Sequence, residues 1–216
     1  ICVAREQHAV ERVRQLFAQA LGYALPKHIG EYSLQRERLA GAQQHAPYVL
    51  FLHGTTWPSK HWPPTSWRAL AEHLSKQGVA VRIPWGSAEE EQRAHFIAKD
   101  LPLVSVLPRL NITGVAGQIA GAQACVAVDT GLGHLAAALD VPCVSLYGPT
   151  LPGRVGAYCQ GQVHLCAPGP NAGLGDRNAP CFDQLDAEQV LAALQPLLTL
   201  TTQMPQTDIQ QSEQDK

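Results

Sequence analysis

The sequence predicts an α/β fold in which helices cover both faces of a parallel sheet. From residue 48 onward, short apolar runs alternate with amphipathic segments, and the apolar runs end in glycine or small polar residues. Strands that alternate with helices are typical of βαβ units, whose crossover helices cover the sheet. The 216 residues suffice for one large domain, or for about one and a half domains of ordinary size.

The expected elements follow one another in a regular order. Residues 4–21 place apolar side chains at helical spacing, and Gly22 is a typical helix stop. The apolar runs predict strands at 48–56, 79–87, 104–107, 124–131 and 142–148. The amphipathic segments predict helices at 66–78, 89–101, 111–122, 134–140 and 187–198. Asp186 and Gln189 form a capping box for the last helix, and residues 149–180 are rich in Gly and Pro.

These elements divide the chain into three parts. Residues 1–46 combine a helix with a polar, irregular stretch, and we expect them to form the end of an N-terminal domain and a connector between domains. Residues 47–198 contain all the predicted strands and form the second domain. Residues 199–216 are rich in Gln, Thr, Asp and Ser, a composition that predicts a disordered tail.

The bulk composition excludes several classes of protein. The balance of 16 basic and 18 acidic residues argues against nucleic-acid binding, which usually requires a strong basic excess. No apolar run approaches the ~20 residues of a membrane span, and no signal segment opens the sequence. The six cysteines form no CxxC pair and fit no zinc spacing, so we expect free thiols in a reducing compartment.

Three polar clusters follow predicted strands, after Leu52, Ile83 and Val128. In parallel sheets of this kind, ligands bind in the crevice outside the carboxyl ends of the strands. The sequence therefore predicts that these three clusters share one binding site.

The third cluster, "VDTGLGH" at residues 128–134, predicts a phosphate-binding turn. Gly131 and Gly133 let an anion approach the backbone, and Thr130 adds a hydroxyl donor. The positive end of the following helix points the same way, and His134 lies in its first turn. The alternative is an ordinary N-cap, with Asp129 or Thr130 satisfying the helix end.

The first cluster, "HGTTWPSKHWP" at residues 53–63, supplies further groups for an anion. Thr55 and Thr56 can donate hydroxyls, and Lys60 can place a positive charge on a phosphate. Together with the glycine turn, these groups suit a diphosphate. The alternative is a solvated loop with a surface lysine, and we expect His53 and His61 to be structural.

The middle cluster, "PWGSAEEEQRA" at residues 84–94, places three glutamates in the first turn of a helix. Such acids usually respond to the helix dipole, but one of them could bind a ribose diol. A serine hydrolase is disfavoured because the sequence lacks the G-x-S-x-G elbow.

Taken together, the three clusters and the later "YGPT" resemble the lipopolysaccharide heptosyltransferases of glycosyltransferase family 9, and most of all the heptosyltransferase I branch. The resemblance reaches from the first helix to about Leu198. It implies a GT-B fold whose Rossmann-like C-terminal domain binds a nucleotide sugar. It also implies inverting transfer of L-glycero-D-manno-heptose from ADP-heptose to Kdo-lipid A, without cofactor or metal, at the cytoplasmic face of the inner membrane.

The resemblance also implies roles for individual residues. Thr55 and Thr56 would bind the diphosphate, and Lys60 would stabilise the leaving group. Glu90 would bind the ribose hydroxyls, and Leu110 would line the adenine pocket. Asp129 would contact the heptose. Thr130, Gly131 and His134 would form the phosphate-binding turn.

The sequence departs from the family in one important respect. The family's general base is an aspartate near the start of the N-terminal domain, and this sequence begins after that region, as a fragment would. We therefore expect this chain alone to bind the donor but to transfer poorly, and Lys60→Ala to impair turnover far more than folding. The alternatives are another GT-B transferase, such as a heptosyltransferase II-like enzyme, or a non-catalytic nucleotide-binding Rossmann module.

Overall fold

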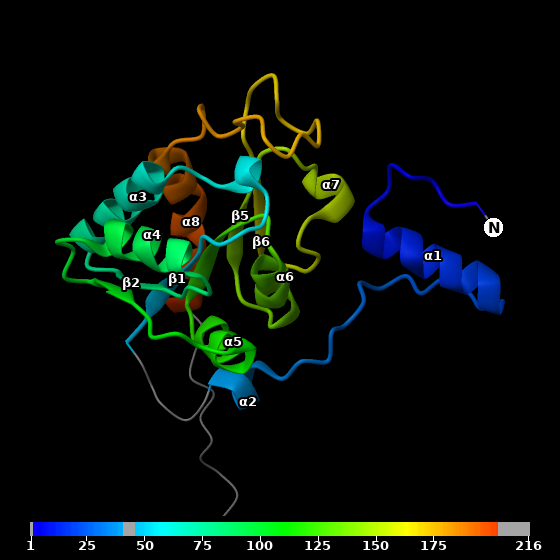
Figure 1. The fold of residues 1–216 in the computed structure, drawn as a ribbon. Helices are drawn as coiled ribbons and strands as arrows, with labels where there is room; N and C mark the ends of the chain where they lie inside the picture. Colours follow the sequence, from blue (N-terminus) through cyan, green and yellow to red (C-terminus); the bar gives the residue numbers. More distant parts are fainter. Residues whose placement is uncertain (1, 41–45, 203–216) are drawn as a thin grey trace, which may run out of the picture.

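Six parallel strands form the centre of the computed structural model, which describes residues 2–40 and 46–202 (Figure 1). The strands lie in the order β3-β2-β1-β4-β5-β6, and every neighbouring pair is parallel. Their bounds are β1 Tyr48–Leu52, β2 Ala80–Ile83, β3 Val104–Val106, β4 Ala124–Val128, β5 Cys143–Tyr147 and β6 Gln162–Cys166. The predicted α/β fold with a Rossmann-like parallel sheet is confirmed.

The helices connect these strands and complete the chain. Their bounds are α1 Ala9–Leu21, α2 Arg36–Ala40, α3 Pro64–Lys76, α4 Ala88–Ala98, α5 Ile112–Ala120, α6 Gly131–Ala138, α7 Pro152–Val155 and α8 Ala187–Thr202, with one 3₁₀ turn, η1, at Pro58–Lys60. The predicted capping box opens α8, where Asp186 Oδ1 accepts from the Gln189 amide and Gln189 Oε1 accepts from the Asp186 amide. Helix α8 continues four residues past the predicted boundary at 198, and residues 203–216 lie outside the described chain.

Two hydrophobic cores form because successive side chains of a strand point to opposite faces of the sheet. Val49 and Phe51 of β1 pack with Trp67, Leu70 and the inner faces of α3, α4 and α8. The other face of β1 packs against α5 and α6, in a core that also contains Ile119 and Leu139. All five residues of β1, β4 and β5 are buried, as the near-continuous apolar runs of a covered parallel sheet require.

The strand order creates the place where a ligand can bind. From β1 the chain first builds outward through β2 and β3, then returns to add β4, β5 and β6 on the other side. The connections from β1 and β4 therefore leave in opposite directions, and a crevice opens between them at the carboxyl ends of the strands. The three polar clusters follow β1, β2 and β4, so they meet at this edge of the sheet.

The structure adds elements that the sequence did not predict. Strand β6 lies inside the Gly/Pro-rich segment 149–180, and its residues are half-buried because it forms the edge of the sheet. Because β6 is not fully buried, its sequence QVHLC needs no continuous apolar run of the kind that marks the inner strands. The connector predicted to be irregular contains α2, a helix of five residues that packs on α5.

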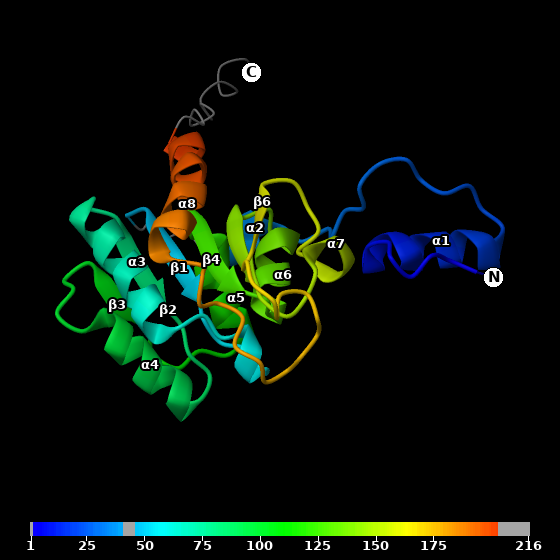
Figure 2. The ribbon, with the colours of Figure 1, turned by 90° about the horizontal axis from the view of Figure 1, so that it is seen from above.

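The N-terminal helix α1 projects from one side of the sheet domain, as two perpendicular views show (Figure 1 and Figure 2). It is attached mainly through polar contacts. His8 Nε2 lies 2.9 Å from the Gly156 carbonyl oxygen, Glu11 accepts a hydrogen bond from the Tyr158 hydroxyl, and Tyr32 donates to the Tyr158 carbonyl. In the described residues, no helix combines the length and apolar character needed to cross a membrane.

Candidate functional site

A cavity of about 360 Å³ lies at the carboxyl ends of β1, β2 and β4. The residues that line it come from all three polar clusters and from the start of α5. They are Leu52, His53, Gly54, Thr55, Thr56, Pro84, Trp85, Gly86, Glu90, Leu110, Ile112, Val115, Thr130 and Leu132. The three clusters therefore converge on one cavity, as the sequence predicts, and its use as a binding site is a proposal.

Glu90 is the member of the acidic triplet that lines the cavity. Ser87 caps α4 by accepting a hydrogen bond from the Glu90 amide, which fixes the first helical turn. The Glu90 carboxylate turns back so that Oε2 accepts from the Gly86 amide at 2.7 Å. A β-carbon on Gly54 would collide with Oε1 of the same carboxylate. The two glycines therefore hold a carboxylate at the cavity wall, where it can accept hydrogen bonds from a diol.

One side of the cavity is apolar. Leu110 and Leu132 face it, together with Ile112, which is 65% exposed at the surface. The Trp85 ring is fixed by a hydrogen bond of 2.7 Å from Nε1 to the Leu107 carbonyl oxygen. A flat heterocycle would find nonpolar contacts on this side, with Glu90 available to polar groups beside it.

Lys60 and Asp129 form an ion pair next to the cavity. Nζ of Lys60 lies 2.7 Å from Oδ2 of Asp129, and their side chains are 15% and 7% exposed. Thr150 donates a hydrogen bond of 2.6 Å to the same Oδ2. Thr55, from the cavity wall, donates to the Asp129 carbonyl oxygen at 3.1 Å and so connects the cavity to the pair.

This pairing revises one expectation about Lys60. Removing the lysine would leave a nearly buried carboxylate without its cation, and such a loss is costly. The sequence predicts that Lys60→Ala impairs turnover far more than folding. The ion pair adds that folding should lose stability as well.

The N-terminus of α6 is open on the same edge. Thr130 is the N-cap residue, but its side chain makes no capping hydrogen bond, and the Asp129 carboxylate is engaged by Lys60 and Thr150. A β-carbon on Gly131 would meet no atom within 4 Å. The alternative of an ordinary side-chain cap is thus wrong, and the first amides of α6 are accessible to an anion.

His134 lies one turn into α6, exposed, beside this group of charges. Desolvation lowers its pKa, and Lys60 and His8 act in the same direction, whereas Asp129 opposes them. The imidazole is consequently neutral near pH 7, when it can offer one donor and one acceptor to a ligand.

His53 and His61 occupy structural positions, as predicted. His53 is 1% exposed, and its Nε2 lies 3.2 Å from the Pro84 carbonyl oxygen. Burial, with Arg93 nearby, lowers the pKa of His53 to about 4. Arg93 donates hydrogen bonds to the His53 carbonyl oxygen and to His61 Nδ1, so the two histidines and the arginine brace the loop after β1.

The predicted site residues thus fall into two adjoining groups. Thr55, Thr56, Glu90, Leu110 and Thr130 line the cavity. Within the described part of the chain, Lys60, Asp129, Gly131 and His134 lie outside that lining, the first two as the ion pair and the others on α6. Residues 2–40 and 46–202 contain no cluster of three His, Cys, Asp or Glu side chains suited to a metal ion.

Sequence reasoning missed several residues of the site: Gly54, Trp85, Ile112, Leu132 and Thr150. Gly54, Trp85 and Leu132 lie inside the three polar clusters, although sequence reasoning assigned them no role of their own. Thr150 closes the YGPT motif after β5, a strand whose carboxyl end also reaches this edge.

Comparisons with known proteins identify the family of the chain. The family model described as glycosyltransferase family 9 (heptosyltransferase) matches residues 1–189. The lipopolysaccharide heptosyltransferase 1 of Pseudomonas aeruginosa is 61% identical over 171 residues, which cover 77% of this chain and 48% of the relative. The structure of Escherichia coli heptosyltransferase WaaC with ADP matches with a TM-score of 0.79 and 41% identity, over 91% of this chain and 59% of that one.

A second structure of the same enzyme, with ADP-2-deoxy-2-fluoro heptose, matches with a TM-score of 0.75 over 91% of this chain and 58% of that one. The chain spans about half the length of the curated relatives it matches. The family model nevertheless covers most of the chain, and the neighbouring structures have the same fold. The chain belongs to glycosyltransferase family 9, the heptosyltransferase family.

Proposed function

We propose that this chain is the donor-binding part of an inverting transferase that moves L-glycero-D-manno-heptose from ADP-heptose to Kdo-lipid A. The observation that carries the proposal is the pairing of a cavity, apolar on one side and acidic on the other, with the uncapped N-terminus of α6 and the Lys60–Asp129 ion pair beside it. Relatives named lipopolysaccharide heptosyltransferase 1, and the WaaC structures with ADP and with an ADP-heptose analogue, support this choice of donor.

The cavity would take the nucleoside. Leu110, Ile112 and Leu132 provide nonpolar contacts for adenine, and Glu90 accepts hydrogen bonds from the ribose hydroxyls. The Gly86 amide already holds the Glu90 carboxylate in place before any ligand arrives. The acid is therefore preorganised, so little conformational entropy is lost when the ribose binds.

The diphosphate would lie between the loop after β1 and the N-terminus of α6. Thr55, Thr56 and Thr130 supply hydroxyls, and Gly131 with its neighbours supplies free amides. His134 completes this side, and Asp129 contacts the heptose. As the bond to the leaving ADP breaks, negative charge grows on the diphosphate, and Lys60 and the α6 N-terminus stabilise it. We assign the general base that deprotonates the acceptor hydroxyl to none of these residues, so the isolated chain would bind donor but transfer poorly.

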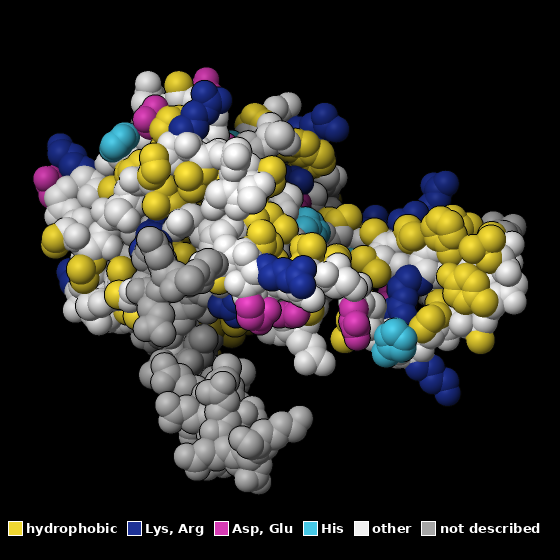
Figure 3. All heavy atoms as spheres, turned by 90° about the horizontal axis from the view of Figure 1, so that it is seen from below, with side chains coloured by type: hydrophobic (Ala, Val, Ile, Leu, Met, Phe, Trp, Pro, Cys, Tyr) yellow, Lys and Arg dark blue, Asp and Glu magenta, His cyan; other side chains and the backbone are white. Residues whose placement is uncertain are grey.

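Residues 1–46 would belong to the end of a second, acceptor-binding domain, followed by the connector to residues 47–198. An exposed apolar surface on α1 and the residues after it supports this division (Figure 3). It includes Val13, Leu16, Phe17, Leu21, Tyr23 and Leu25, each at least 41% exposed. Apolar side chains gathered in this way on a helix and the residues after it are typical of a surface that packs against another domain.

The lipid acceptor would place the protein at the cytoplasmic face of the inner membrane, held peripherally. With a net charge of −2, the chain as a whole is not attracted electrostatically to anionic lipid. The contact with the membrane would therefore come from the acceptor itself rather than from a basic patch.

Calorimetric titration of the chain with ADP, UDP and NAD tests the proposal. We expect binding of ADP in preference to UDP and NAD, and weaker ADP binding for Lys60→Ala. A preference for UDP would assign a different transferase, and a preference for NAD a Rossmann module of another class. Titration with ADP-heptose and ADP-glucose then tests the sugar, since only the heptose donor should gain affinity over ADP.

A further inference from the structure

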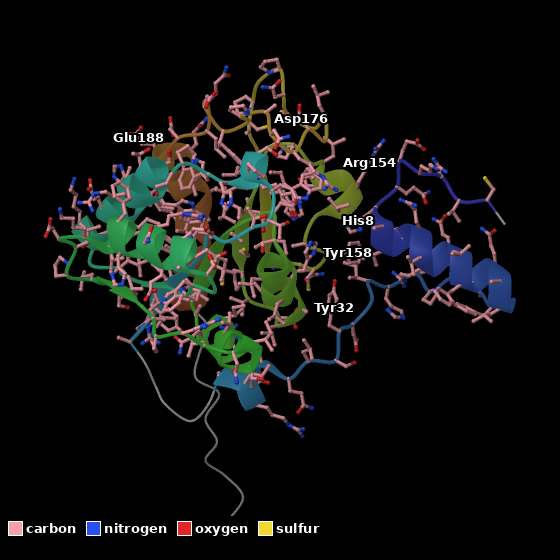
Figure 4. All side chains as sticks on the ribbon, viewed as in Figure 1. His8, Tyr32, Arg154, Tyr158, Asp176 and Glu188 are labelled. Carbon is pink, nitrogen blue, oxygen red and sulfur yellow. The ribbon has the colours of Figure 1, made fainter. Side chains whose placement is uncertain are left out.

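The segment Gly169–Pro180, here called the strap, crosses the site edge and joins two of its parts. Within the strap, Gly169, Gly173 and Gly175 have positive φ angles, and the Asp176 carboxylate accepts from the amides of Asn178 and Ala179. These features give the strap a defined course without helix or strand. Figure 4 shows Asp176 in the loop that passes over η1 and the end of β5.

One side of the strap is bound to η1, the turn that carries Lys60. The Ser59 hydroxyl donates to the Asp176 carbonyl oxygen at 2.8 Å, and the Ser59 amide donates to the Arg177 carbonyl oxygen at 3.1 Å. Ser59 is 4% exposed, so both bonds are shielded from water. The backbone of Arg177 is therefore fixed against the residue that directly precedes Lys60.

The other side of the strap is bound to the end of β5. The Gly173 amide donates to the Gly148 carbonyl oxygen at 2.9 Å, and the Gly175 amide donates to the Pro149 carbonyl oxygen at 2.7 Å. Thr150, which holds Asp129, follows directly. The strap thus connects the turn that carries Lys60 to the loop that positions its acidic partner.

Two cations lie against one indole ring at this junction. Nζ of Lys60 is 4.3 Å from the ring centroid of Trp57, and the Arg177 guanidinium carbon is 4.6 Å from the same centroid. Like charges gathered in this way repel each other, although the ring attracts each of them. Asp129 already offsets the charge of Lys60, so the excess positive charge at this junction is that of the exposed Arg177, where an anion would find it.

The charges of the two cations are compensated differently. Lys60 is neutralised by Asp129 at 2.7 Å, so the ion pair carries no net charge toward a diphosphate. Arg177 is exposed, and none of the three ion pairs among the described residues includes it. A doubly charged ligand that bound only at the neutral pair would lack a balancing cation, and Arg177 is placed to supply one.

We propose that Arg177 is a second cation for the diphosphate of the nucleotide, brought to the Lys60 turn by the strap and held over Trp57. This inference rests on the proposed function, because it assumes that a nucleoside diphosphate occupies the site. A planar guanidinium suits this role because it can donate two parallel hydrogen bonds to phosphate oxygens.

The test is titration of the 216-residue chain with ADP and with adenosine, for the wild type and for Arg177→Gln, Arg177→Lys and Arg38→Gln. Arg38 is the matched control because it is exposed on α2, a helix whose Arg36 bonds to carbonyls at the opposite end of β4. Arg177→Gln should weaken ADP binding about tenfold, as the loss of a charged hydrogen bond does. It should leave adenosine binding unchanged.

Arg177→Lys should recover most of the lost affinity, and Arg38→Gln should bind both ligands as the wild type does. Thermal unfolding of each variant verifies that the strap remains in place. Equal ADP affinity of Arg177→Gln and wild type would overturn the proposal, as would equal losses for ADP and adenosine or a failure of Arg177→Lys to recover binding. If the wild type bound adenosine and ADP equally or not at all, the diphosphate site itself would be refuted, and this inference with it.

Discussion

The two halves of the site are built in opposite ways. The cavity is formed by the loops that directly follow β1, β2 and β4 and by the start of α5, and its wall combines nonpolar side chains with one carboxylate. The charged group is assembled from Lys60 after β1, Asp129 after β4 and Thr150 after β5, whose side chains meet at one carboxylate oxygen. The first half depends on shape and the second on charge.

This difference separates the consequences of mutation. A substitution in the cavity wall changes the fit of a ligand while the sheet beneath it remains packed. A substitution in the charged group also changes the fold, because Asp129 is 7% exposed and needs its partners. Substitutions in the cavity wall should therefore change ligand affinity without changing stability, whereas substitutions at the ion pair should change both.

The largest expected effect is that of Lys60→Ala. Loss of the ammonium leaves Asp129 with the Thr150 hydroxyl alone, so we expect the free energy of unfolding to fall by about 3 kcal/mol. ADP affinity should fall about a hundredfold, because a charged hydrogen bond is lost and the Asp129 carboxylate is left without its cation beside the diphosphate. Urea unfolding and calorimetry measure the two effects.

Lys76→Ala, at the exposed end of α3, is the matched control and should change neither quantity. Addition of Asp129→Asn to Lys60→Ala should restore part of the stability but none of the binding. If the single variant Lys60→Ala had the same free energy of unfolding as the wild type, the ion pair would not link stability to ADP binding.

The second effect concerns pH and the base of the cavity. Burial lowers the pKa of His53 from 6.5 to about 4, so the unfolded chain binds a proton that the folded chain excludes. The stability that His53 contributes is present above pH 6.5 and is lost as the pH falls toward 4. Between pH 7 and pH 5 the loss should be about 2 kcal/mol.

Urea unfolding of the wild type and of His53→Gln at the two pH values isolates this contribution. Glutamine can still donate to the Pro84 carbonyl oxygen but does not titrate, so its pH dependence should be smaller. His95→Gln, on the exposed face of α4, should retain the dependence of the wild type. If the stability of His53→Gln depended on pH as strongly as that of the wild type, the pH dependence would come from groups other than His53.

The smallest effect, and the sharpest separation, is expected from Gly54→Ala. The new methyl group would occupy the place of Glu90 Oε1, and that atom is the end of a flexible side chain that can move away. ADP affinity should fall about tenfold, the value of one or two hydrogen bonds, while stability changes little.

Gly30→Ala is the control, because a β-carbon there would meet no atom within 4 Å. Calorimetry with ADP and with inorganic diphosphate sharpens the result. Only the affinity for ADP should fall, because inorganic diphosphate has no ribose to contact the displaced carboxylate. An equal loss for both ligands would place the effect outside the cavity.

Much of the fold could be predicted from the sequence because burial on both faces of a parallel sheet produces continuous apolar runs. The runs at β1, β4 and β5 mark strands whose every residue is buried. Strand β6 was missed because an edge strand needs no such run, and its residues remain half-exposed. The short helix α2 was missed because five residues carry no clear period.

The site could be predicted less completely. The pattern of polar residues after strands located the loops, since ligands bind where strands end. Which of the three glutamates faces the cavity depends on the turn of α4 and on the Gly86 amide. The residue pattern left that choice open, and only the resemblance to the family indicated Glu90. The ion pair of Lys60 and Asp129 joins residues far apart in the chain, so no local pattern could reveal it.

The contact between Gly54 and Glu90 also constrains how such a site can change over generations. A side chain at residue 54 would displace the carboxylate that residue 90 extends across to it. A shorter residue at position 90 would free that space, and a larger residue at position 54 would then be tolerated. Positions 54 and 90 should therefore covary: glycine should be required at position 54 only where position 90 is glutamate.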